Sequence, residues 1–191
     1  MRLVILGRQG SGKGTQSVRL VEHYGVIHVS TGDMLRAAVA EGSDVGRRAQ
    51  AVMDAGELVS DDIMNAVVAE RLAKPDIRSC GVLLDGFPRT PAQADALERI
   101  VGRGGLDAAV NLDVPVEVVR ERMLSRGRVD DTPEAIERRL ELYEQETAPL
   151  LDWFEDRGLL TVIDGVGTED EVFARLVEAI DARRPEADVP A

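Results

Sequence analysis

A short apolar stretch that runs into a glycine-rich loop restricts the fold of this chain more than any other feature. Residues 3–6 are Leu-Val-Ile-Leu, and residues 7–15 are Gly-Arg-Gln-Gly-Ser-Gly-Lys-Gly-Thr. Between a strand and a helix, such a loop aims its backbone N–H groups, the positive end of the helix dipole and one lysine at an anion. The spacing of Gly7, Gly12 and Lys13 matches the phosphate-binding loop pattern. A chance glycine-rich turn is the alternative, and the flanking strand and amphipathic helix disfavour it.

The end of this loop departs from the usual pattern. A serine or threonine that holds magnesium normally follows the lysine directly. Here Gly14 follows Lys13, and the hydroxyl comes one residue later, at Thr15. This displacement indicates a narrower group of proteins than the loop by itself.

The composition is that of a single enzyme-sized domain without a nucleic-acid partner. The chain has 191 residues and a net charge of −12, and this length is enough to bury a substantial core. Nucleic acids are bound by basic surfaces, so the charge argues against DNA or RNA. An anionic small molecule would have to be met by arginines concentrated at one place.

Cysteine usage and hydrophobic patterning predict a cytoplasmic protein. Cys80 is the one cysteine, which argues against a disulfide framework or a cysteine zinc site and fits a reducing compartment. Met1 leads directly into the first expected strand, which leaves no room for a signal peptide, and no apolar run is long enough to span a bilayer. We expect no membrane partner, and a monomer in the absence of any sign of an oligomer.

Strand and helix patterns alternate along the chain. Apolar runs typical of buried strands lie at 3–6, 26–29, 81–84, 108–112 and 160–163. Patterns typical of helices lie at 13–24, 90–101, 116–125, 133–156 and 169–182. This alternation predicts an α/β fold with a doubly wound five-stranded parallel sheet, covered by helices on both faces. Ligands of such sheets bind at the carboxyl ends of the strands, where the glycine-rich loop would lie.

Two segments interrupt the alternation. Residues 30–59 show short helical patterns at 34–40 and 45–55 but no strand, which predicts a helical excursion beside the sheet. A short polar loop at 126–132 separates two helical patterns. We expect one domain, residues 1–191, whose parts are a core of 1–29, 60–125 and 133–184, these two segments, and a frayed tail at 185–191.

A second chemical element follows the apolar run at 81–84 and reads Asp85-Gly86-Phe87-Pro88-Arg89. An aspartate at the end of a buried strand beside a phosphate loop can hold magnesium directly or through water. Taken alone, Asp85 is more simply a cap of the following turn, and the nearby loop makes us favour the metal role. Arg89 is either an ordinary surface arginine or, because its guanidinium is a planar fork, a bidentate phosphate ligand.

Four segments together resemble the adenylate kinase family, and the resemblance runs from Met1 to about residue 180. The segments are Gly12-Lys13-Gly14-Thr15-Gln16, Ser30-Thr31-Gly32-Asp33-Met34-Leu35-Arg36, Asp85-Gly86-Phe87-Pro88-Arg89-Thr90 with Gln93, and Gly127-Arg128-Val129-Asp130-Asp131 with Arg139. Four segments in the family's order and at its separations are much stronger evidence than a phosphate loop alone.

The resemblance implies the P-loop nucleoside monophosphate kinase fold and the reaction ATP + AMP ⇌ 2 ADP, which serves adenine nucleotide homeostasis. The phosphate of AMP is an anion at neutral pH, so no general base is required, and catalysis would rest on alignment and charge stabilisation. We therefore interpret His23 and His28 as structural. The implied catalytic residues are Lys13, Arg89, Arg126, Arg128 and Arg139.

On the donor side, the resemblance implies that Lys13 and the loop amides hold the phosphates of ATP. Arg122 would stack on the base, Arg126 would meet the phosphates, and Gly167 would contact the base through its backbone. The implied ATP-binding residues are Gly10, Ser11, Gly12, Lys13, Gly14, Thr15, Arg122, Arg126 and Gly167. Mg²⁺ would be approached by Asp85 and Asp33 through water. A solvated charged helix face with Glu117 and Glu121 is the alternative for Arg122 and Arg126.

On the acceptor side, the resemblance places AMP against the segment 30–59. The implied AMP-binding residues are Thr31, Arg36, Glu57, Leu58, Val59, Gly86, Phe87, Pro88, Arg89, Gln93, Arg128 and Arg139. The amide of Gln93 would read the adenine edge, because it is both donor and acceptor. The related UMP/CMP kinases usually carry alanine and asparagine at the positions of Thr31 and Gln93, which favours AMP. The Phe87–Pro88 bond is usually cis in relatives, and we predict cis here.

The segment 126–132 resembles the short-lid form of the family. Long members insert a small domain at this place, in some cases with four zinc-binding cysteines. The single cysteine here lies elsewhere, at Cys80, so we expect no zinc. We expect the lid and the segment 30–59 to close over the nucleotides and to exclude water, which could otherwise accept the phosphoryl group.

Two other function classes stay open at this point. A nucleotide-binding switch without enzymatic activity would need a base-reading motif of the Asn-Lys-x-Asp type, and the nearest string, Asn111-Leu112-Asp113, lacks the lysine and the spacing. A nucleoside monophosphate kinase that accepts UMP or CMP is the nearer alternative.

The glycine-rich loop differs from that of the family at two positions. The family commonly has proline at the position of Gln9, and often a small residue or proline at the position of Arg8. We expect Arg8 to point toward solvent and both changes to be tolerated. Replacing Gln9 by proline should therefore alter KM or kcat only modestly in a steady-state phosphoryl-transfer assay. Loss of activity in this variant would contradict that expectation.

Overall fold

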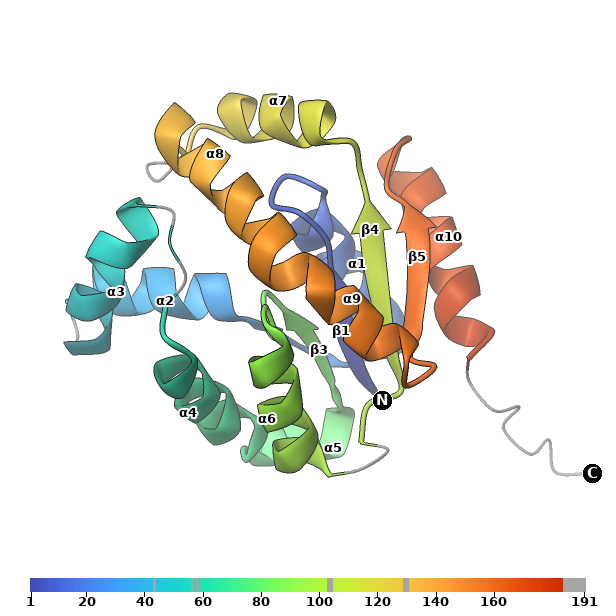
Figure 1. The fold of residues 1–191 in the computed structure, drawn as a ribbon. Coiled ribbons are helices and arrows are strands. Elements are labelled where there is room, and N and C mark those ends of the chain that lie inside the picture. The colour runs from blue at the N-terminus through green and yellow to red at the C-terminus, as the bar shows by residue number, and fades with distance from the viewer. Residues whose placement is uncertain (43, 56, 58, 103–104, 129–130, 184–191) are drawn as a thin grey trace, which may run out of the picture.

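The fold is built on one parallel sheet (Figure 1). The computed structural model describes residues 1–42, 44–55, 57, 59–102, 105–128 and 131–183, so Leu58 and the expected tail at 185–191 lie outside the described residues. Within these ranges five strands pair in parallel in the order β2-β3-β1-β4-β5. The strands are β1 (Arg2–Leu6), β2 (Ile27–Ser30), β3 (Val82–Asp85), β4 (Ala108–Asp113) and β5 (Leu160–Asp164). The predicted sheet is confirmed, and each strand lies within one residue of its expected bounds.

Helices cover both faces of the sheet, as expected for a doubly wound fold. Val4 and Leu6 of β1 belong to a core cluster that also contains Leu97 and Phe154. This layer is formed by α4 (Asp61–Leu72), α6 (Pro91–Val101) and α9 (Ala148–Glu155). Leu3 and Ile5 point to the other face and pack against α1 (Lys13–Tyr24) and α10 (Glu169–Asp181). Because successive strand residues point to opposite faces, a strand buried on both sides reads as an unbroken apolar run.

The expected excursion beside the sheet consists of α2 (Thr31–Ala40) and α3 (Asp44–Asp54), which lie next to each other at one side in Figure 1. Helix α2 begins three residues earlier than predicted. The hydroxyl of Ser30 accepts a hydrogen bond from the backbone N–H of Asp33 at 3.3 Å, and such an N-cap sets the first residue of a helix.

Two helices between the excursion and β3 were missed by the sequence analysis. In α4, apolar residues occur on most sides of the helix, from Ile63 to Ala69, so no stripe with a helical period stands out. Helix α5 (Pro75–Cys80) has six residues, which is too short to show a period. The other helices, α7 (Val116–Arg126) and α8 (Pro133–Leu142), begin where they were predicted.

The long helix expected at 133–156 is interrupted by a π turn. Helix α8 passes into a π-helical stretch, η1 (Tyr143–Thr147), and then into α9. A π turn changes which residues face the sheet without ending the helix, and it is frequent at functional sites.

The parallel strands bring several predicted site residues to one edge of the sheet. Gly7 follows the end of β1, Asp85 ends β3, and Ser30 ends β2, with Ile5 and Ser30 both in register with Asp85. The Phe87–Pro88 bond beyond β3 is cis, as predicted. Among the described residues, no helix combines the length and apolar character needed to cross a membrane.

Candidate functional site

A cleft of about 500 Å³ opens at the carboxyl edge of the sheet. It collects residues from all four motif segments, which extend along the sequence from Gly12 to Arg139. The predicted site residues that line it are Gly10, Gly12, Lys13, Gly14, Thr15, Thr31, Asp33, Arg36, Glu57, Val59, Asp85, Gly86, Pro88, Arg89, Gln93, Arg122, Arg126, Arg128 and Arg139. The fold therefore brings together most of the residues that the sequence singled out.

Three described site residues that were predicted, Ser11, Phe87 and Gly167, are not among those that line the cleft. Ser11 is a buried residue of the loop itself, and Phe87 is fully buried in the core cluster that includes residues of α6. Gly167 directly precedes Thr168, the N-cap of α10, and Leu58 lies outside the described residues. The nucleotide contacts assigned to these four stay predictions.

The cleft also has apolar walls that the sequence analysis missed. Leu35, Met64 and Leu142 line it, together with Tyr143 and Thr147 of the π turn. Leu35 lies four residues after Thr31 on α2, so a search for i, i+4 neighbours of the motif residues could have found it. No sequence signal marks the other four, because their position depends on how α4 and the π turn pack.

The glycine-rich loop is held in close contact with its surroundings. Gly10 has φ +83°, and a Cβ at this position would lie 2.6 Å from the carbonyl oxygen of Val119 on α7. A side chain there would therefore push the loop off α7. This explains physically why a glycine is required in the middle of the loop.

Lys13 is buried in the middle of this loop. Its ammonium donates hydrogen bonds to the carbonyl oxygens of Gly7 at 2.6 Å and Arg8 at 2.9 Å. Burial lowers the pKa of Lys13 to about 8; Asp85 opposes this shift, whereas Arg89 and Arg126 add to it. Lys13 is thus a cation that lacks full compensation, and an anion in the cleft would supply it.

Asp85 has the properties of a ligand for a hard cation. Burial opposes its ionisation, but the nearby imidazole of His28 and the charge of Lys13 hold the pKa of Asp85 below its usual range. Thr15 and Asp33 line the same cleft. Within the described ranges, no three His, Cys, Asp or Glu side chains group together as a metal site. A cation held by one carboxylate, water and phosphate oxygens fits this arrangement, and Mg²⁺ binds in this way.

Asp131 organises the arginines on the lid side of the cleft. It accepts hydrogen bonds from Arg126 at 2.6 and 2.9 Å and from Arg139 at 2.9 Å, and its side chain is 1% exposed. Burial opposes ionisation, but the hydrogen bond and charge of Arg126 and the charges of Arg139 and Arg128 hold the pKa of Asp131 below its usual range. Asp131 stood in a family motif but was assigned no role from the sequence, and it fixes two predicted catalytic arginines.

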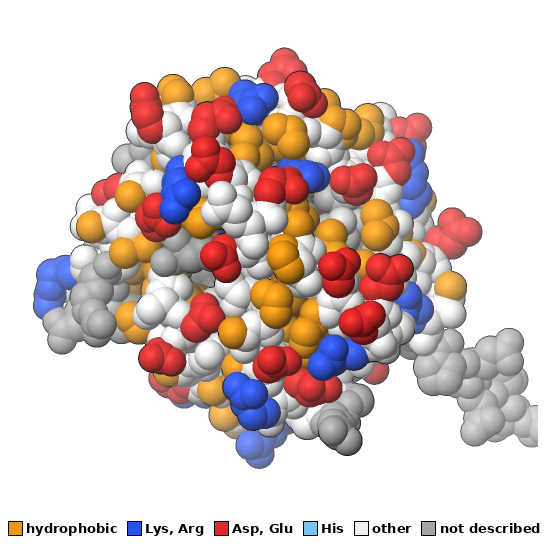
Figure 2. All heavy atoms as spheres, in the orientation of Figure 1, with side chains coloured by type: hydrophobic (Ala, Val, Ile, Leu, Met, Phe, Trp, Pro, Cys, Tyr) orange, Lys and Arg blue, Asp and Glu red, His pale blue; other side chains and the backbone are white. Residues whose placement is uncertain are grey.

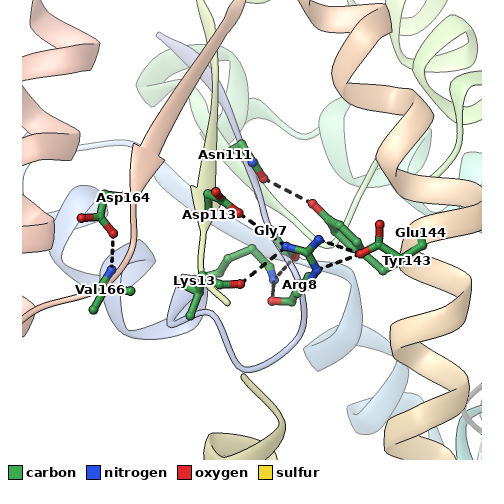
Figure 3. A network of polar contacts seen from close by, with 10 residues as sticks. Gly7, Arg8, Lys13, Asn111, Asp113, Tyr143, Glu144, Asp164 and Val166 are labelled. Atoms are coloured by element: carbon green, nitrogen blue, oxygen red, sulfur yellow. Dashed lines mark hydrogen bonds and ion pairs between the residues drawn. The ribbon is translucent and has the colours of Figure 1, made fainter. Parts of the chain in front are cut away.

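Arg8 does not point toward solvent, so that prediction is wrong. Its guanidinium donates to Oε1 of Glu144 at 2.9 and 2.6 Å, approaches Oδ1 of Asp113 at 3.5 Å, and lies 5.0 Å from the ring centroid of Tyr143 (Figure 3). The hydroxyl of Tyr143 donates in turn to Oδ1 of Asn111 at 3.4 Å. Arg8 thereby fastens the glycine-rich loop to the π turn, because Tyr143 and Glu144 both belong to that turn.

The two histidines occupy different environments. His23 packs edge-on against Tyr24 and Phe173, between α1 and α10, in agreement with a structural role. His28 lies closer to the site than expected, with its Nε2 atom 3.6 Å from Oδ2 of Asp85. Its proximity helps to keep the pKa of the Asp85 carboxyl group low.

The surface and the cleft differ in charge. Acidic side chains are spread over the face shown in Figure 2, in keeping with the net charge of −12. Among the described residues, the cleft gathers Lys13 and six arginines: Arg36, Arg89, Arg122, Arg126, Arg128 and Arg139. Such a concentration suits a ligand with several phosphate groups.

Comparisons with known proteins agree with the geometry. A family model described as Adenylate kinase matches residues 5–159. A protein of Stenotrophomonas maltophilia (strain K279a) named "Adenylate kinase" is 50% identical over 188 residues, which cover 95% of this chain and 100% of that protein. One of the same name from Nocardia farcinica (strain IFM 10152) is 50% identical over 182 residues, covering 94% and 99%. A third, from Xanthomonas euvesicatoria pv. vesicatoria (strain 85-10), is 48% identical over 186 residues, covering 94% and 99%.

Replacing Arg8 by alanine should weaken the binding of a nucleoside triphosphate by about three- to tenfold, because about 1 kcal/mol of ion-pair and cation–π interaction holds the loop in place. Arg19→Ala is the matched control. Arg19 pairs with Asp170 at 2.7 Å and stacks on Phe173 at 4.3 Å, but it does not line the cleft.

Thermal unfolding and ATP titration of both variants check this prediction. Both substitutions should lower the melting temperature by a few degrees, whereas the affinity for ATP should fall in Arg8→Ala alone. Equal affinities in the two variants would show that Arg8 has no part in holding the loop.

Proposed function

The chain belongs to the adenylate kinase family, and we propose that its cleft transfers the γ-phosphoryl group of ATP to AMP, giving two molecules of ADP. The convergence of Lys13 and six arginines in one cleft of an acidic protein is the observation that carries this proposal. Two nucleotides bring several phosphate groups to within a few ångströms of each other. Their mutual repulsion has to be offset by fixed positive groups for transfer to occur.

The donor nucleotide would occupy the side of the cleft formed by the glycine-rich loop. The amides of residues 10–15 and the ammonium of Lys13 surround a space suited to phosphates, with the N-terminus of α1 behind it. Arg122 donates to the carbonyl oxygen of Ser11 at 3.4 Å, which supports a position for this arginine beside the loop and near the base or phosphates of ATP.

The acceptor would occupy the side formed by α2, Glu57 and Val59. Arg36 and Arg89 line this part of the cleft, and the guanidinium of Arg89 is oriented by a 2.9 Å hydrogen bond from its Nε to the carbonyl oxygen of Gly86. Thr31 is tied to the same carbonyl at 2.9 Å. These contacts favour a rigid site for one phosphate and the base of AMP.

The residues of the transfer step act through position and charge. The AMP phosphate carries its own negative charge, so the chain need not remove a proton from it. Lys13, Arg89, Arg126, Arg128 and Arg139 would surround the transferring group and stabilise the charge that spreads over its oxygens. Asp131 holds Arg126 and Arg139 in place before the substrates bind, which reduces the reorganisation that the transfer requires.

Mg²⁺ fits the acidic side of this cleft. Asp85, with Asp33 and Thr15 near it, would hold the ion through water and the phosphates of ATP. When bound, the ion would neutralise part of the charge of the phosphates.

The segments 30–59 and 126–132 would act as closing elements, with the remaining core as the rigid part. A bidentate ion pair joins the segment 30–59 to the core. Arg138 on α8 donates to Glu57 at 2.7 and 3.2 Å, so the AMP segment and the helix that carries Arg139 already meet beside the cleft. We further propose that the protein acts in the cytoplasm, in line with its single cysteine, Cys80, and that it is a monomer.

A coupled assay with ATP and AMP, UMP, CMP or dTMP tests the proposed function. We expect turnover with AMP at a kcat/KM at least about a hundredfold above that of the pyrimidine nucleotides. Absence of turnover with AMP would refute the proposal. Turnover with UMP or CMP instead would identify a pyrimidine nucleotide kinase, and tight ATP binding without any turnover would identify a switch.

The affinity for ATP should decrease as the pH rises through about 8. The free protein loses the charge of Lys13 above its pKa of about 8, whereas bound phosphates would raise this pKa and keep the ammonium protonated. Binding then takes up a proton, and Kd should rise by up to about tenfold per pH unit.

Titrations with ATP between pH 7 and 9.5, in which the phosphates of ATP are largely ionised from pH 8 upward, measure this dependence. Lys13→Met should bind ATP more weakly at pH 7.5 and should show no further loss above pH 8. The same pH profile in both proteins would show that Lys13 is not the titrating group.

A further inference from the structure

The side-chain amide of Gln93 is held at both ends by protein groups. Its Oε1 atom accepts a hydrogen bond from the backbone N–H of Arg89 at 2.8 Å, and its Nε2 atom donates to Oδ1 of Asp61 at 2.6 Å. Gln93 is 2% exposed and lines the cleft. Asp61 is the first residue of α4 and was given no role by the motifs.

A second path joins the same residues into a ring. The backbone N–H of Gln93 donates to Oγ1 of Thr90 at 3.1 Å, and this hydroxyl donates to Oδ2 of Asp61 at 3.2 Å. Both carboxylate oxygens of Asp61 are therefore engaged as acceptors. Because Thr90 is the N-cap of α6, the ring connects the first turns of two helices.

The chemistry of these partners permits one orientation of the amide. A backbone N–H can only donate, and a carboxylate oxygen can only accept. Rotating the amide by 180° would place Nε2 against the N–H of Arg89 and Oε1 against Asp61. Both hydrogen bonds would be lost, and two repulsive contacts would replace them in a buried place.

From this arrangement we propose that Asp61 is a specificity-determining positioning residue: it locks the Gln93 amide in the orientation that accepts a 6-aminopurine and rejects a 6-oxopurine. The inference deepens the proposed function and rests on it. An amide has two donor and two acceptor positions. With one of each taken by Asp61 and Arg89, one N–H and one lone pair remain for a base in the cleft.

The two purine classes need opposite amide orientations. Adenine offers an acceptor at N1 and a donor at its 6-amino group, which match the free N–H and the free lone pair of Gln93. Hypoxanthine and guanine offer a donor at N1 and an acceptor at O6, the reverse pattern. They would need the rotated amide, which the ring around Asp61 opposes, and a buried polar mismatch is a strong basis for rejection.

Asp61→Asn tests the lock, because an asparagine side chain can turn and donate to a rotated Gln93. The measurement is kcat/KM with ATP as donor and AMP or IMP as acceptor. We expect the ratio of AMP to IMP to fall by at least about tenfold, with the value for AMP reduced less than about fivefold and that for IMP increased. Proportional losses with AMP and IMP would overturn the proposal, since they would mean that Asp61 is merely structural.

Asp62→Asn is the matched control. Asp62 is the next residue in the first turn of α4 and is exposed, so this variant makes the same change of charge at the same helix end. It should keep the AMP to IMP ratio of the parent within about twofold. An equal fall of the ratio in Asp62→Asn would also contradict the lock, because the effect would then come from charge alone.

Two further variants complete the test. If Asp61→Asn does not fold, Asp61→Ser should show the same fall in the ratio, since serine is accepted at helix starts and its hydroxyl can donate or accept. In a Gln93→Leu background, Asp61→Asn should leave the ratio unchanged, and a further change would show that Asp61 acts by another route. If the parent protein does not turn over AMP, the proposed function is refuted. If an active Asp61 variant keeps the parent's ratio of AMP to IMP, only the proposed role of Asp61 is refuted.

Discussion

Repulsion between like charges is the constraint on which the site depends. Among the described residues, Lys13 and six arginines line one cleft, and such a group is unstable unless negative charge lies among it. Asp85 and Asp131 supply that charge, and the pKa of each is held below its usual range. Both carboxylates therefore stay ionised near neutral pH. Their negative charges offset enough of the repulsion for the protein to fold. The cleft still keeps an excess of positive charge for anionic ligands.

Backbone geometry, more than pairing of side chains, brings these groups together. Parallel strands end at one edge, so the loop behind β1, Asp85 of β3 and the start of α2 are neighbours although they are far apart in sequence. The glycine-rich loop then rests on α7 at Gly10, and Arg8 ties it to the π turn. Contacts from two sides hold a loop that contains little side-chain mass of its own.

The sequence predicted the elements whose signals are local. Each strand is an apolar run between turns, and the phosphate loop is a contiguous motif, so both were found. Helices α4 and α5 lacked a clear period or sufficient length, and the π turn has no local signature. The partners of Arg8, Gln93 and Asp131 come from packing between segments. The sequence indicated which of these residues stood out, but the contacts that give them a physical role depend on the tertiary fold.

The burial of Lys13 has a consequence for chemical labelling. The chain contains two lysines, and the other, Lys74, has a side chain that is 56% exposed. With a pKa of about 8, roughly a tenth of the Lys13 side chains carry a neutral amine at pH 7, whereas an ordinary lysine is almost fully protonated. An electrophile shaped to enter the cleft meets a nucleophilic amine with little competition from the rest of the chain. The lysine that we propose to bind phosphate is thus also a candidate attachment point for a covalent ligand.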